Sequence, residues 1–148
     1  LENFHLTLAF IGETDRHGFA DAVDALSEIE APAFDLKLSG IGSFGERPLR
    51  ALWAGVASNP DLMHLQSKVE TALRRKGFDL EKRKFVPHVT LAYLQGARRE
   101  DVERSSIEHS LFATEPFLID AFHLYSSQLG NAASHYEIEA SYSLSSSR

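Results

Sequence analysis

Two copies of a histidine–threonine motif are the residues of this chain best suited to chemistry. The segment His5-Leu6-Thr7-Leu8-Ala9-Phe10-Ile11 near the start matches His88-Val89-Thr90-Leu91-Ala92-Tyr93-Leu94. Side chains alternate between the two faces of a strand, so the histidine and the threonine of each copy share one face. Two such faces brought together would combine two imidazoles with two hydroxyls. Because imidazole exchanges protons near neutral pH, the pattern predicts paired general acid and general base catalysis.

Metal binding is an alternative role for the two histidines. Imidazole is a common zinc ligand, but the chain has no cysteine and no H-E-x-x-H motif, so the ligand set would be incomplete. We therefore expect neither a metal nor another cofactor. The absence of a G-x-S-x-G motif disfavours a serine hydrolase. The other histidines are interpreted as surface or packing residues, and the expected strand of one, His123, could join the same sheet; they are His17, His64, His109, His123 and His135.

Length and composition restrict the class of protein. A chain of 148 residues with 43% hydrophobic and 24% charged residues fits one globular domain. No apolar run approaches the roughly 18 residues of a membrane span, and the absence of cysteine is compatible with a cytoplasmic location. The net charge of −6 argues against binding along nucleic acid through many phosphate contacts. A small site for one phosphate or one RNA end is compatible with this charge.

Hydrophobic periodicity and helix caps predict the elements that must position the motifs. Thr14 or Asp15 can cap a first helix, and Pro60 and Gly77 mark the two ends of a second. Each motif is followed by a helix and two strands, which indicates an internal duplication into two lobes. The expected elements are a helix to about residue 29, strands over 34–38 and 49–57, a helix from 60 to 77, a strand over 85–94, a helix over 100–112, and strands over 117–126 and 135–144.

The glycine-rich segment Gly40-Ile41-Gly42-Ser43-Phe44-Gly45 matches the dinucleotide-binding pattern G-x-G-x-x-G. That pattern requires a helix directly after it, whereas Pro48 and a strand-like segment follow here. We interpret the segment as a hairpin loop. Phe44 at its tip would then offer an exposed ring on which a base could stack, and it is a candidate for substrate binding.

The doubled motif resembles the 2H phosphoesterase superfamily, and most of all its bacterial RNA 2',3'-cyclic phosphodiesterase branch, also called 2'-5' RNA ligases. The resemblance implies an α+β fold, bilobal and pseudo-twofold, with antiparallel sheets flanked by helices around a central groove. It implies one domain over 1–148, lacking a strand and a helix that usually precede the first motif. The matching residues are Asn3–Gly12, Leu52-Trp53-Ala54-Gly55-Val56, Phe85–Ala92 and Leu124-Tyr125-Ser126-Ser127.

The resemblance also implies an activity, which is metal-independent hydrolysis of RNA 2',3'-cyclic phosphate ends to 2'-phosphates. One histidine would take the proton of a water, and the other would protonate the 3' oxygen. By analogy, His5 is the acid and His88 is the base, while Thr7 and Thr90 donate hydrogen bonds to the phosphoryl oxygens. Because a catalyst accelerates both directions, the same groups could also seal 2'-5' ends.

The substrate is the least constrained expectation. Relatives often carry arginine at the position of Tyr93, so Tyr93 is a second candidate for substrate binding whose contact differs from theirs. Alternatives are a 2H enzyme for 2'-5' oligoadenylate or a small cyclic nucleotide, and a non-catalytic module that binds RNA ends. We expect a cytoplasmic monomer with no membrane partner, acting on RNA ends or nucleotides that carry a 2',3'-cyclic phosphate.

Overall fold

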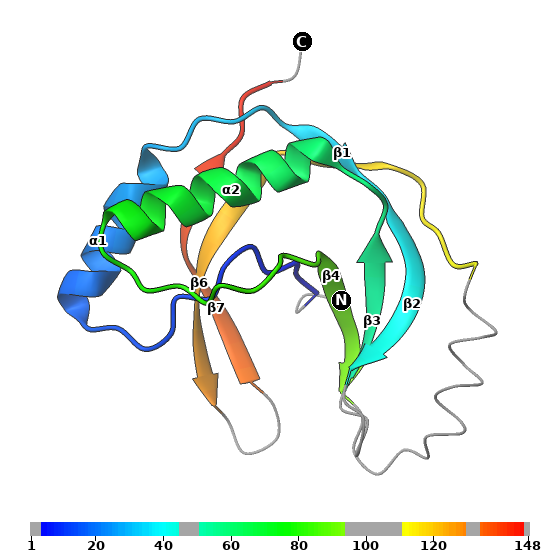
Figure 1. Ribbon diagram of the computed structural model, residues 1–148, viewed down its shortest axis with the longest axis horizontal. Helices are drawn as coiled ribbons and strands as arrows, with labels where there is room; N and C mark the ends of the chain where they lie inside the picture. The colour runs from blue at the N-terminus through cyan, green and yellow to red at the C-terminus, as the bar shows by residue number, and fades with distance from the viewer. Residues whose placement is uncertain (1–3, 45–50, 94–110, 130–133, 147–148) are drawn as a thin grey trace. The chain divides into compact units, whose positions relative to one another are not determined.

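The computed structural model describes residues 4–44, 51–93, 111–129 and 134–146 (Figure 1). Within these residues the chain forms helices and small sheets, which confirms the expected α+β class. No helix in this part of the chain is long and apolar enough to cross a membrane. The elements are α1 (Arg16–Ser27), β1 (Phe34–Leu36), β2 (Leu38–Phe44), β3 (Ala51–Val56), α2 (Pro60–Arg75), β4 (His88–Tyr93), β5 (Phe117–Ile119), β6 (Ala121–Leu129) and β7 (Ser134–Ser143).

The chain divides into two compact units, each built from three segments. The first unit comprises Leu1–Leu8, Leu36–Asn59 and Lys84–Phe117, and the second comprises Ala9–Asp35, Pro60–Arg83 and Leu118–Arg148. Both motif copies therefore belong to the first unit, apart from the last residues of the first copy, and both helices belong to the second. The boundary falls inside β1 and β5, which pair with each other.

Helix α1 of the second unit begins where the sequence predicts. The Asp15 carboxylate accepts a hydrogen bond from the Gly18 amide at 2.8 Å, which satisfies an amide that has no partner within the helix. The helix buries Ala22, Ala25 and Leu26 and ends at Ser27, two residues earlier than expected.

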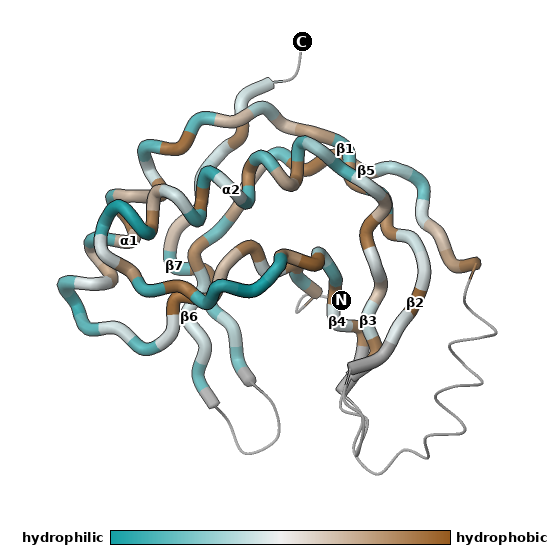
Figure 2. Tube along the Cα trace, in the orientation of Figure 1, coloured by the Kyte–Doolittle hydropathy of each residue, from teal (hydrophilic) through white to brown (hydrophobic). Residues whose placement is uncertain are grey.

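Helix α2 begins at Pro60, as expected, because proline needs no amide partner in a first turn. Gly77 ends it with a φ of 100°, a conformation that glycine adopts without a steric penalty. The Gly77 amide donates to the Arg74 carbonyl at 3.0 Å, and the Phe78 amide donates to the Leu73 carbonyl at 3.1 Å. These bonds form a Schellman motif and confirm the expected stop. The buried stripe of α2 is Leu62, Leu65, Val69 and Leu73. Hydrophobic and hydrophilic stretches alternate along this helix (Figure 2).

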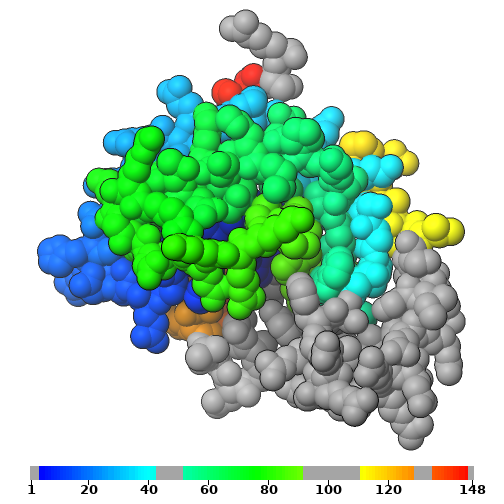
Figure 3. Space-filling view, in the orientation of Figure 1, coloured from blue at the N-terminus to red at the C-terminus, as the bar shows by residue number. Residues whose placement is uncertain are grey.

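Strands β6 and β7 pair antiparallel and complete the second unit. The rings of Phe122 and Tyr142 stack with centroids 5.0 Å apart, and the Tyr142 hydroxyl donates to the Val23 carbonyl of α1 at 3.2 Å. The strand expected over 117–126 is interrupted at Asp120, which separates β5 from β6. In the space-filling view, α2 and the segment that follows it form one continuous surface (Figure 3).

The first unit is built on the antiparallel sheet β2-β3-β4. The expectation of a hairpin loop at Gly40–Phe44 is wrong, because these residues form most of β2. Glycine is accepted there because the Trp53 side chain of β3 occupies the space where a side chain of Gly42 would lie. The expected strand over 34–38 is also divided, with Lys37 between β1 and β2.

Three other expectations concern the motif segments and their neighbours. The first copy is no regular strand, since Leu6 alone makes a bridge. The strand of the second copy begins at His88 rather than at residue 85, because Pro87 has no amide to donate to a neighbouring strand. The helix expected over 100–112 lies outside the described residues except for its last two residues, which are not helical.

Candidate functional site

The two motif copies lie side by side in the first unit. Leu6 of the first copy and Val89 of β4 form an antiparallel bridge. In an antiparallel ladder centred on this bridge, the histidine of each copy would stand opposite the threonine of the other copy and share one side of the pair with it. The opposed pairs would be His5 with Thr90 and Thr7 with His88.

This register sets the spacing of the proposed chemical groups. If the extended geometry of the bridge continues to its neighbours, all four residues share one face and Leu6 and Val89 the other. The two histidines are then diagonal neighbours, and such positions are about 7–8 Å apart in a regular antiparallel pair. His5, His88 and Thr90 are half-buried, and Thr7 is exposed. A group the size of a phosphate could therefore contact both rings.

The sheet extends this face away from the first motif. Thr90 pairs with Trp53 of β3, and Trp53 pairs with Gly42 of β2. His88 pairs with Gly55. Because paired residues share a face, Trp53 and both glycines lie on the side of His88 and Thr90.

The imidazole of His88 is oriented by its own chain. Its Nδ1 lies 2.8 Å from the carbonyl oxygen of Val86. A carbonyl only accepts hydrogen bonds, so Nδ1 carries the proton and donates it. The nitrogen that can take up or release a proton is then Nε2.

The Trp53 indole lies beside this imidazole. The ring centroids are 6.2 Å apart and the ring planes are inclined by 60°. A Cβ atom at Gly42 would lie 2.2 Å from Cζ2 of the indole, which shows how closely the ring covers that glycine. The indole thus fills the sheet face next to His88.

A bulge in β4 determines which later residues share the face. Leu52 pairs with Ala92, but its neighbour Trp53 pairs with Thr90, so Leu91 is an extra residue on β4. In a regular strand, positions 90 and 93 would lie on opposite faces because they are three residues apart. The bulge instead places the backbone position of Tyr93 on the same side as Thr90.

The two predicted substrate-binding residues occupy the ends of two strands. The backbone positions of Phe44 and Tyr93 both pair with Ala51, so they form one row across the sheet next to the row of Trp53. Their side chains lie outside the described part of the chain.

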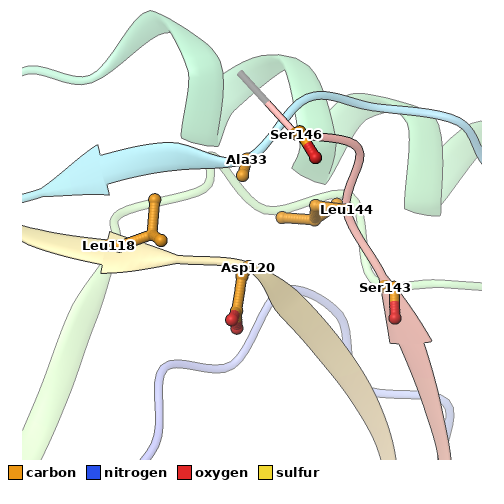
Figure 4. A pocket seen from close by; sticks show the side chains of 6 residues that line it. All are labelled: Ala33, Leu118, Asp120, Ser143, Leu144 and Ser146. Atoms are coloured by element: carbon orange, nitrogen blue, oxygen red, sulfur yellow. The ribbon is translucent and has the colours of Figure 1, made fainter. Parts of the chain in front are cut away.

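Other candidate sites lie elsewhere in the fold. His123 belongs to the second unit, where its Nδ1 is 2.8 Å from the Ser141 hydroxyl. Among the described residues, no group of three or more histidine, aspartate or glutamate side chains is arranged to hold a metal ion. A cavity of about 490 Å³ in the second unit includes none of the motif residues (Figure 4). Its lining is Ala33, Leu118, Asp120, Ser143, Leu144 and Ser146.

Comparison with known families finds a match over most of the chain. The family model described as the 2'-5' RNA ligase superfamily matches residues 2–131, which include both motif copies. The chain belongs to the 2'-5' RNA ligase superfamily. The expected membership is thereby confirmed.

Several curated relatives in this superfamily carry the name RNA 2',3'-cyclic phosphodiesterase. The protein from Aeropyrum pernix is 41% identical over 123 residues, which cover 74% of this chain and 69% of the relative. The protein from Thermotoga maritima is 31% identical over 140 residues, covering 93% and 73%. The protein from Geobacillus stearothermophilus is 38% identical over 94 residues, which cover 62% of this chain but only 30% of that longer relative.

Two solved structures share the fold of this chain. E. coli LigT in complex with 3'-AMP superposes with a TM-score of 0.75 at 23% identity, covering 97% of this chain and 78% of LigT. The protein TT0787 of Thermus thermophilus gives a TM-score of 0.76 at 23% identity, covering 98% and 80%.

The sequence did not identify Trp53 or its glycines as part of this site. One sequence signal could have indicated it. Trp53 is two residues from Gly55, and the preceding strand carries Gly40 and Gly42; glycines in neighbouring strands indicate a place where another group lies close to the sheet. The register that connects these residues to His88 depends on strand pairing, which the sequence does not display.

Proposed function

We propose that this chain hydrolyses 2',3'-cyclic phosphate ends of RNA to 2'-phosphates, with His5 and His88 exchanging the protons. The observation that carries the proposal is the bridge between Leu6 and Val89, which joins the two motif copies in a register that supports a histidine of one copy facing a threonine of the other. The names of the curated relatives, which refer to the same reaction, support it.

The reaction needs two proton transfers on opposite sides of the phosphorus. A water oxygen forms a bond to phosphorus while the bond from phosphorus to the 3' oxygen breaks. One neutral imidazole takes the proton of the water, and a protonated imidazole gives its proton to the departing 3' oxygen. The diagonal placement of His5 and His88 supports this division of labour.

We assign the base to His88 and the acid to His5. Nδ1 of a neutral His88 keeps its proton and hydrogen-bonds the Val86 carbonyl, so the lone pair of the ring is at Nε2. The hydroxyls of Thr7 and Thr90 donate hydrogen bonds to the non-bridging oxygens, where negative charge develops. A 5' hydroxyl in place of the water would give a 2'-5' link by the same transfers.

Phe44 and Tyr93 are proposed to contact the nucleotide. The support for this role is the row that their backbone positions form beside Trp53 and Thr90. Tyrosine can stack and can donate one hydrogen bond, whereas arginine would bind a phosphate through a charged fork. The expected cytoplasmic location and monomeric state stay predictions.

The deciding experiment uses purified protein and cytidine 2',3'-cyclic phosphate, followed by an RNA oligonucleotide with the same end. Phosphorus NMR distinguishes the 2'-phosphate from the 3'-phosphate, and we expect only the 2' product. Turnover should be equal in EDTA and in magnesium, because no step is assigned to a metal. Exclusive 3'-phosphate, or tight binding of the RNA end without turnover, would contradict the proposal.

A further inference from the structure

Trp53 takes part in no step of the proposed reaction, yet it lies beside two of the residues that do. It is paired with Thr90 across β3 and β4, and its ring lies beside the His88 imidazole with centroids 6.2 Å apart. Two residues that carry the proposed chemistry therefore flank one indole.

The backbone around Trp53 leaves space for the ring in this place. A Cβ atom at Gly42 would lie 2.2, 2.6 and 2.7 Å from three atoms of the indole. A Cβ atom at Gly55, opposite His88, would lie 2.7 Å from the Ser39 carbonyl oxygen and 3.4 Å from the indole. Atoms that close cannot coexist, so a side chain at Gly42 would force the ring to move.

We propose that Trp53 is a positioning residue for His88. Its indole, lying across Gly42, restricts the imidazole from one side, while the Val86 carbonyl holds Nδ1. Together they limit rotation about the two side-chain torsions of His88, so that Nε2 keeps one direction. A catalytic group held in a narrow range of orientations reacts faster than one that must be ordered at each turnover. The consequence for turnover rests on the proposed function.

A positioning role predicts a particular kinetic pattern. Trp53→Ala should lower kcat about tenfold and change KM less than about twofold, because the indole orients a catalytic ring. Trp53→Phe keeps an aromatic ring on the sheet and should recover most of the loss. Both variants should be compared at equal folded fraction, measured by circular dichroism.

Gly42→Ala tests the same idea without changing Trp53 or His88. The new methyl group displaces the indole, so kcat should fall by a factor similar to that of Trp53→Ala. In the double variant the two losses should not add, because the second change finds no indole to displace. Gly18→Ala, on α1 in the second unit, is the control: its methyl group would meet the Thr14 Oγ1 atom, which can rotate away, and lie 3.2 Å from Thr14 Cβ and 3.5 Å from Asp15 Oδ1.

A second measurement needs no substrate. Trp53 is the single tryptophan of the chain, so intrinsic fluorescence reports on it alone. A protonated imidazole beside an excited indole quenches its emission, so a pH scan should show the intensity change as His88 exchanges its proton. The change should vanish in His88→Gln and persist in His64→Gln, whose site is on the exposed surface of α2.

These measurements separate the two proposals. If wild-type protein does not hydrolyse the cyclic phosphate, the proposed function fails, and fluorescence still tests the contact of Trp53 with His88. If the enzyme is active but Trp53→Ala keeps its kcat, or the two losses add, the positioning role is wrong. An unchanged fluorescence titration in His88→Gln would also overturn it.

Discussion

The two compact units of this chain hold different kinds of residue, the proposed catalytic side chains in one and most of the buried core in the other. The histidines and threonines of both motif copies lie in the first unit. Among the described residues, the first unit buries fully only Leu36 and Ala54 of its apolar side chains, while the other core residues belong to the second unit. Because the proposed catalytic residues and most core residues lie in different units, we expect that either set can be changed without disturbing the other.

Removing either motif histidine should have the largest effect. His5→Ala and His88→Ala should each lower turnover of a 2',3'-cyclic nucleotide at least about a hundredfold, the usual contribution of a general acid or base. Because neither side chain is buried in the core, the melting temperature should stay close to that of the wild type. His64→Ala serves as the control, with both quantities unchanged. A lower melting temperature of the motif variants would contradict the expectation that the motif residues do not stabilise the fold.

The converse change removes a core side chain of the second unit. Leu65 on α2 is 2% exposed, and Leu65→Ala should lower the free energy of unfolding by about 2–5 kcal/mol. Chemical denaturation measures this loss, and kcat per folded molecule should be unchanged. Met63→Ala on the same helix, at a side chain that is 43% exposed, should cost less than about 0.5 kcal/mol.

Substitutions of Thr7 and Thr90 show whether the two motif copies contribute equally to the reaction. Thr7→Val and Thr90→Val keep the shape of the side chain but remove the hydroxyl, and each should lower kcat about tenfold to a hundredfold. The loss should be larger at Thr90, which is half-buried beside Trp53, because hydrogen bonds strengthen where water is scarce. Thr90→Ser should restore most of the rate. Equal losses at both positions would mean that the copies are equivalent despite their different settings.

The smallest effect concerns alkaline stability of the second unit. Burial, and then the negative charge of Asp24, raise the pKa of the Tyr142 hydroxyl above its usual value. The folded state therefore holds this proton to higher pH than the unfolded chain does. The resulting stability is present below about pH 10 and is lost as the pH rises through the folded pKa. Tyr142→Phe should flatten the pH dependence of the melting temperature above pH 10 while leaving kcat unchanged.

The sequence predicts much of the second unit because its signals are local. Asp15 caps α1, Pro60 begins α2 and Gly77 ends it, and each acts on atoms within four residues. The motif residues are found for a different reason, namely that histidine and threonine are chemically distinctive and occur twice at the same spacing.

The first unit is harder to predict because its features depend on strand pairing. Gly40 and Gly42 are typical of turns, but both belong to β2: Gly42 lies under the Trp53 ring of the next strand, and Gly40 adopts a φ of 80°. A bridge between Leu6 and Val89 joins the first copy to β4 in place of the expected strand. Contacts between residues far apart in the chain leave no local pattern to read.

The extra residue Leu91 in β4 has a consequence for comparing relatives. It interrupts the alternation of side chains between the two faces, so that positions 90 and 93 lie on one side although they are three residues apart. A relative without the bulge could align with this chain at every letter and still turn the residue at position 93 toward the opposite side. Tyr93 and an arginine aligned with it are therefore comparable only if both strands carry the bulge and turn that residue to the same face.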